Sequence, residues 1–206
     1  MVEAIDAQDL RQLPLRALVA LAARCARRVQ PLFDLPKDQT GRPGHLRVVD
    51  YAIEIAERFA AGDETVSPAC AYSAATAFQT VYSVTPIASS ARLAASSAAA
   101  AAYAASTAYS AEGVAREVAK SALNAVTASC VVPPALEAAR VDLRRLNRLH
   151  LGTFPDLGDP VDFSARGTLG PLWPKRMPDW YVASLCEPPA DGMKGPNNRP
   201  RTPSFG

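Results

Sequence analysis

Residues 65–111 read TVSPACAYSAATAFQTVYSVTPIASSARLAASSAAAAAYAASTAYSA, and Arg92 is the single charged residue among these 47. Elsewhere the chain is well charged, since charged residues make up 20% of its 206 residues. The stretch consists mainly of Ala, Ser, Thr and Tyr, and it contains few Leu, Ile or Val. Ala is the strongest helix former, and small side chains let helix axes approach to about 8 Å. The composition therefore predicts buried, closely packed helices in an all-α protein.

Two capping signals divide this stretch into two helices. Ser67-Pro68 and Thr85-Pro86 each place a hydroxyl at the N-cap and a proline at the first helical position. They predict helices over about 68–83 and 86–109, which we expect to form the central layer of a bundle. Arg92 should then reach the edge of the bundle or a carboxylate. Aromatic side chains should fill the gaps between the helices: Tyr72, Phe78, Tyr82, Tyr103 and Tyr109.

Apolar residues at helical spacing predict four more helices, which flank the uncharged stretch. They cover about 14–29, 45–61, a segment that starts near Ser110, and 133–151. Short links between helices favour antiparallel neighbours, so residues 1–152 should form a single antiparallel bundle of about six helices. Several arginines lie off the apolar stripes, and we expect them on a solvated face with ion pairs to Glu54 and Glu57: Arg24, Arg27, Arg28, Arg140, Arg144 and Arg148.

The helical pattern stops at Gly152, and ten of the chain's 18 prolines lie in the last 55 residues. We expect an extended tail, with a strap over 153–187 and disorder over 188–206. Both tryptophans of the chain lie in the strap. The strap could cover the protein's own helices, or it could dock onto a partner or a second subunit. The docking candidates are Trp173, Met177, Trp180 and Tyr181.

Catalytic and metal-binding motifs are missing from the sequence. It contains no HExxH, CxxC, GxSxG, GxxxxGK or GxGxxG pattern, and its two histidines, His45 and His150, are far apart. The four widely spaced cysteines are interpreted as small buried hydrophobic residues: Cys25, Cys70, Cys130 and Cys186. We therefore expect no cofactor, no metal and no enzymatic activity.

Charge and hydropathy favour a cytoplasmic protein without membrane contact. The net charge is +2, so no strong overall field attracts nucleic acid or an anionic membrane. The N-terminus is acidic and lacks the basic and apolar regions of a secretion signal. Nucleic-acid binding stays open as an alternative, because the arginines could form one basic patch if the first and last helices adjoin: Arg24, Arg27, Arg28, Arg140, Arg144, Arg145 and Arg148.

Four segments carry a resemblance to a known family: LAARCARRVQPLF, HLRVVDYAIEIAERFAAG, AYSAATAFQTVYS and AASSAAAAAYAASTAYSAEGVAREVAKSAL. Their order resembles that of the all-helical immunity proteins of bacterial toxin systems, over residues 18–150. That family often carries histidines in its Ala-rich helices, where this chain has Tyr and Phe. The resemblance implies a cytosolic, non-catalytic protein that binds another protein, such as a toxin.

The first functional hypothesis is thus a non-enzymatic protein-binding module, whose most concrete form is an immunity-like protein that occludes a partner protein. The runner-up is a structural or scaffold subunit that docks through its tryptophan-containing tail. An enzyme or a nucleic-acid binder comes third. The candidate protein-binding residues are Trp173, Met177, Trp180, Tyr181, Arg140, Arg144 and Arg148.

Overall fold

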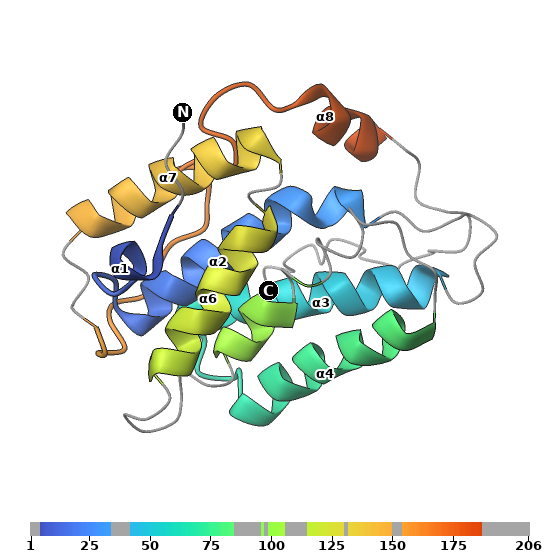
Figure 1. Ribbon diagram of the computed structural model, residues 1–206, viewed down its shortest axis with the longest axis horizontal. Coiled ribbons are helices and arrows are strands. Elements are labelled where there is room, and N and C mark those ends of the chain that lie inside the picture. The colour runs from blue at the N-terminus through green and yellow to red at the C-terminus, as the bar shows by residue number, and fades with distance from the viewer. Residues whose placement is uncertain are drawn as a thin grey trace, which may run out of the picture.

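A computed structural model describes residues 5–33, 42–84, 96, 99–105, 115–129, 132–149 and 154–186. Helices make up most of this part of the chain, and no strand occurs in it (Figure 1). The predicted all-α class is therefore confirmed. Arg92, His150, most of the fourth predicted helix and residues 188–206 lie outside the described residues. The antiparallel arrangement of six helices stays a prediction.

Helix α2 (Leu15–Val29) lies at the centre of the protein, where it packs against α3 (Arg42–Ala60), α6 (Ala115–Ser129) and α7 (Pro133–Arg148) (Figure 1). All of its side chains are buried except those of Arg16 and Arg27. Its Ala-rich sequence explains this position, because small residues on every face let several helices approach closely.

The prediction that the helix over 68–83 belongs to a central layer was wrong. This helix, α4 (Pro68–Val84), packs against α3, and Figure 1 shows it at the edge of the molecule. Ala71, Ala74 and Ala75 are buried, whereas Tyr72 is 56% exposed. An Ala-, Ser- and Tyr-rich face buries little apolar area per residue, so leaving it in water costs little. In α4, therefore, absence of charge did not indicate burial, whereas Ala101, Ala102, Ala104 and Ala105 further along the uncharged stretch are fully buried.

Two other expectations about single side chains were also wrong. Tyr103 is partly exposed and does not fill a gap in the core. Cys70 lies on the exposed face of α4, whereas Cys25 is buried in α2 as expected.

The boundaries of α2, α4 and α7 lie close to the predicted ones, but two other features differ from the prediction. Helix α3 begins three residues early, because Pro43 is compatible with the first turn of a helix. A short helix that was not predicted, α1 (Ala7–Leu10), precedes α2. Asp6 caps it through bonds from the backbone N–H groups of Gln8 and Asp9, at 2.7 and 2.9 Å.

Residues 154–186, which we call the strap, lie on the helices of their own chain. The carbonyl oxygens of Asp156 and Leu157 accept hydrogen bonds from the backbone N–H groups of Leu15 and Arg16, both at 2.9 Å. These N–H groups open α2 and have no partner inside the helix. Val161, Leu169, Trp173 and Tyr181 are buried and belong to the same apolar core as the helices. The strap thus completes both the start of α2 and the core.

The sequence predicted an extended tail, but the strap is not extended throughout. It ends in a helix, α8 (Asp179–Cys186), whose first turn carries the acidic Asp179. The backbone N–H groups of Tyr181 and Val182 bond to the carbonyl oxygen of Pro178 at 2.9 and 3.1 Å. An acid in the first turn and a preceding proline are ordinary helix-start signals. We did not predict this helix from these signals, because the high proline content of the tail favoured an extended chain.

Candidate functional site

A buried network of arginines holds the middle of the strap against α2 and α7. Arg28 and Asp142 are both 0% exposed, and Arg28 Nη2 lies 2.5 Å from Asp142 Oδ2. Arg24 Nε lies 3.0 Å from the same carboxylate oxygen. Asp142 therefore pairs with two buried guanidinium groups, which leaves the three residues with a net positive charge.

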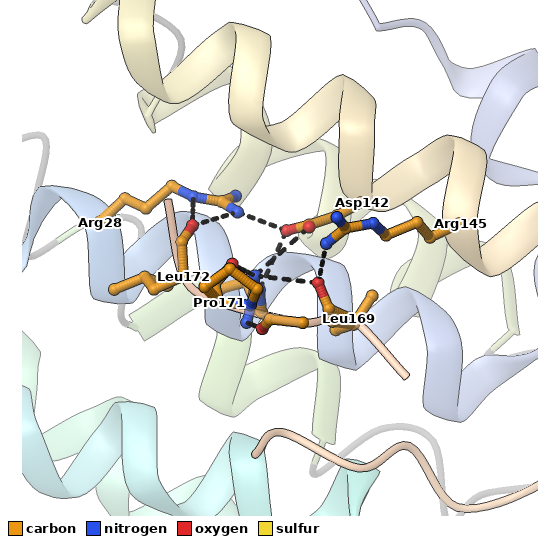
Figure 2. A network of polar contacts seen from close by, with 8 residues as sticks. Arg28, Asp142, Arg145, Leu169, Pro171 and Leu172 are labelled. Carbon is orange, nitrogen blue, oxygen red and sulfur yellow. Dashed lines mark hydrogen bonds and ion pairs between the residues drawn. The ribbon is translucent and has the colours of Figure 1, made fainter. Parts of the chain in front are cut away.

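The strap backbone accepts the remaining hydrogen bonds of this network. Arg28 Nε donates to the carbonyl oxygen of Leu172 at 2.9 Å, and Arg24 Nη2 donates to that of Pro171 at 2.7 Å. Arg145 donates to Leu169, and Figure 2 shows Arg28 and Arg145 reaching toward this segment from their two helices. Carbonyl dipoles compensate part of the excess charge, so the strap is bound by charge-assisted hydrogen bonds as well as by apolar contacts.

The electrostatics of Arg24 follow from this burial. Loss of water lowers the pKa of the Arg24 guanidinium, and the carboxylate of Asp142 offsets only part of that effect. Arg27, on another side of α2, has a different setting. Burial lowers its pKa, but hydrogen bonds from Arg27 to Glu57 and Asp50, both 2.6 Å long, outweigh burial and raise it.

These contacts correct the prediction that the arginines of α2 lie on a solvated face. Arg24 and Arg28 are buried, and only Arg27 forms the expected ion pair with Glu57. The first and last helices do adjoin, since α2 packs against α7. The single basic patch nevertheless does not form, because Arg24 and Arg28 point into the protein and bind Asp142.

The aromatic residues of the strap pack on one another beside this network. Trp173 makes edge-on contacts with Trp180 and Tyr181, with ring centroids 6.1 and 5.3 Å apart, and the Arg28 guanidinium lies 5.9 Å from its ring centre. Burial raises the pKa of Tyr181, whereas Arg27 and the indole N–H of Trp173 lower it in part. That N–H nevertheless makes no hydrogen bond of normal geometry. The cluster fixes the course of the strap where it meets α7.

A groove of about 400 Å³ lies between α7 and the strap. Its lining combines apolar side chains with charged ones. The residues that line it are Pro134, Glu137, Ala138, Arg140, Val141, Arg144, Trp173, Pro174, Lys175 and Arg176.

The cations of the groove differ in their partners. Lys175 Nζ lies 3.0 Å from Glu137 Oε2, and Arg176 Nη2 lies 3.0 Å from Asp179 Oδ1. Arg140 and Arg144 have no carboxylate partner among the described residues. Arg140 Nε is buried and lacks a hydrogen-bond partner, and Arg144 Nε donates a long bond of 3.3 Å to the Arg140 carbonyl oxygen. The α7 side of the groove thus holds two uncompensated positive charges.

Three of the seven predicted binding residues line the groove, and the other four lie outside its lining. Arg140, Arg144 and Trp173 line the groove, although Trp173 is only 5% exposed. Met177 is 44% exposed, Trp180 is half-buried and Tyr181 is buried. Arg148 is exposed and does not line the groove. Trp173 and Tyr181 therefore have little surface to offer a partner in this arrangement.

Sequence reasoning missed Asp142, Lys175 and Arg176. Asp142 could have been found, because it lies on the buried stripe of α7 between Ala138 and Leu146, where an acid is unusual. Lys175 and Arg176 lie among the prolines of the strap, and only the fold shows that they face α7.

Other features of the described chain offer less chemistry. No group of three or more His, Cys, Asp or Glu residues that could hold a metal ion occurs in this part. A second hollow, of about 420 Å³, is lined mainly by apolar atoms at α1, α6 and Phe154. Among the described helices, none combines the length and apolar character that a bilayer-spanning segment needs.

Comparisons with known proteins do not place the chain in a family. A scan against models of known families, a search of curated proteins and a search of solved structures each found no match. Inference about function therefore depends on the groove and its surroundings.

Proposed function

We propose that the protein is a non-enzymatic binding module that contacts another protein through the groove between α7 and the strap. The single observation that carries this proposal is the pair of uncompensated arginines, Arg140 and Arg144, beside an apolar floor. Arginine is enriched among the residues that dominate the energy of protein interfaces, and such residues cluster in well-packed pockets. In its most concrete form, the proposal is an immunity-like protein that occludes its partner.

The chemistry of the groove supports binding more than catalysis. Its described lining offers guanidinium, ammonium and apolar groups, and it includes no His, Cys, Ser or Thr side chain. An occluding protein needs a complementary surface and does not need a nucleophile or a general base. The resemblance to helical immunity proteins points in the same direction.

The alternative is a scaffold subunit that docks through its tryptophan-containing tail. It would use the exposed side of the strap near α8, where Met177 and Val182 are 44% and 42% exposed. Trp173 and Tyr181 would contribute only if the strap left the helices. The structure therefore favours the groove, although self-association through α8 remains a distinct and testable outcome.

Site-specific photo-crosslinking in the source cells tests the proposal. A photoreactive residue replaces Val141, which lines the groove, or Tyr72, which is exposed on α4 far from it in sequence. We expect one dominant partner protein to be crosslinked from position 141 and not from position 72, and to copurify one-to-one. Its yield should fall in the Arg140→Ala/Arg144→Ala variant.

Two results would count against the proposal. Equal crosslinking from both positions would remove the groove as the binding surface. A crosslink between two copies of the chain, together with an oligomer in light scattering, would support the scaffold alternative. If a partner is a toxin, coexpression should rescue cells from it, and the double arginine variant should fail to do so.

A further inference from the structure

We infer that the groove recognises an acidic segment of the partner, with a carboxylate bound between Arg140 and Arg144. This inference rests on the proposed function and names the chemistry of the partner. The groove holds four cationic residues and one acidic residue, Glu137, which already pairs with Lys175. Since Arg176 pairs with Asp179, the positive charge left for a ligand lies on Arg140 and Arg144.

The buried nitrogen of Arg140 is the strongest indication of a ligand. Its Nε is shielded from water and has no hydrogen-bond partner among the described residues. A buried donor that stays unsatisfied is costly, so we expect the Arg140 side chain to turn and donate this bond to an incoming carboxylate oxygen. Arg144 lies one helical turn further along α7, so its guanidinium lies on the same face as that of Arg140. Two guanidinium groups on one face suit a planar carboxylate, which can accept paired N–H donors.

The floor of the groove adds a second requirement to the ligand. Ala138, Val141 and Pro174 present apolar atoms beside the arginines. A cavity of about 400 Å³ lies near the lower end of the size range of ligand pockets. It has room for one or two side chains and not for a helix. The best fit is an extended segment in which an acidic residue lies next to an aliphatic one.

Nucleic acid fits this groove less well than an acidic peptide. Phosphate backbones are bound by extended basic surfaces, whereas the net charge of this chain is only +2. Glu137 on α7 and Asp179 on the strap also place negative charge beside the groove, where it would repel the many phosphates of an extended backbone. Single strands need exposed aromatic rings for stacking, and Trp173 is buried.

Nuclear magnetic resonance titration with defined probes tests the inference. The probes are a short peptide of alternating Glu and Leu, the same peptide with Gln for Glu, inorganic phosphate and oligo-dT. The full chain is labelled so that arginine Nε–H signals are seen. We expect the Glu peptide to shift the Arg140 Nε–H signal and to bind at least about tenfold more tightly than the Gln peptide.

A matched pair of variants separates the groove from general charge. Arg140→Gln/Arg144→Gln should weaken binding of the Glu peptide at least about tenfold. Arg148→Gln removes a charge from the same helix outside the groove, and it should change binding by less than about twofold. Urea unfolding of each variant shows whether the fold is intact.

Several outcomes would overturn the inference. One is equal affinity for the Glu and Gln peptides, and another is the absence of a shift of the Arg140 Nε–H signal. A third is an equal loss of affinity for the Glu peptide in Arg140→Gln/Arg144→Gln and in Arg148→Gln. Tighter binding of oligo-dT would indicate nucleic acid instead, and phosphate binding as tight as the peptide would indicate a free-anion site. If crosslinking from position 141 captures a partner while the Glu peptide does not bind, the proposed function stands and the acidic segment is wrong.

Discussion

Asp142 pairs with the two arginines that donate hydrogen bonds to the strap backbone. Its carboxylate is 0% exposed and pairs with Arg24 and Arg28, which are 3% and 0% exposed. Replacing Asp142 by Ala would leave two buried guanidinium groups without a counter-charge. Breaking a buried ion pair by removing one partner costs about 3–5 kcal/mol. In a protein of this size that loss lowers Tm by about 6–20 °C.

Urea unfolding followed by two probes measures this loss. The only two tryptophans, Trp173 and Trp180, lie in the strap, so their fluorescence reports whether the strap is seated. Far-ultraviolet circular dichroism reports the helices. We expect Asp142→Ala to lower the fluorescence midpoint strongly. Coincident midpoints in the two probes would show that strap and helices unfold together.

A control on the same helix separates the buried network from a surface pair. Glu137 pairs with Lys175 where both side chains are exposed, so Glu137→Gln should cost at most about 1 kcal/mol. Adding Arg28→Met to Asp142→Ala removes one uncompensated charge, so the double variant should lose less than the sum of the single losses. If Asp142→Ala costs no more than Glu137→Gln, the reasoning from buried charge fails.

Three further predictions concern other parts of the chain. Deleting residues 165–206 removes Leu169, Trp173 and Tyr181 from the core, so Tm measured by calorimetry should fall; an unchanged Tm would contradict the packing of the strap. Hydrogen bonds from Thr65 and Arg58 lower the pKa of Asp63 to about 2. The stability that Asp63 adds over Asp63→Asn should therefore be full above about pH 4 and fall away as the pH drops through about 2, whereas a difference that is undiminished at pH 2 would refute it. Gly62 has φ 82°, and a Cβ there would lie 2.9 Å from Pro160 Cγ, so Gly62→Ala should cost more than about 1 kcal/mol in urea unfolding. By contrast, Gly44→Ala in the open first turn of α3 should add about 0.5 kcal/mol.

Local patterns predicted most of the helices because the signals that start and stop a helix lie within a few residues. Pro68 and Pro133 begin α4 and α7 where the sequence had indicated, and Gly62 follows the end of α3. The prediction that α2 buries an apolar stripe was correct, but the other faces of this helix are buried as well. The charged residues were harder, since a long arginine side chain is usually solvated.

The buried network could not be predicted from sequence, because its partners are distant along the chain. Arg24 and Arg28 meet Asp142 across 118 and 114 residues, and they meet carbonyl oxygens of a segment that looked irregular. The groove depends on the same long-range contact. The arginines of α7 were identified as candidates, but the strap residues that form the other wall become visible only in the fold.

Folding and binding share one helix in this protein. On α7, Arg140 and Arg144 line the groove, whereas Asp142 and Arg145 hold the strap from within. The groove has two walls only while the strap is seated, so a ligand that binds it must stabilise the seated state. At a concentration 100 times Kd that stabilisation is about 2.7 kcal/mol. It is of the same order as the loss expected for Asp142→Ala, so an acidic ligand should recover much of the stability of that variant. Recovery should be absent when Arg140 and Arg144 are also replaced, because the ligand then loses its differential affinity for the seated strap.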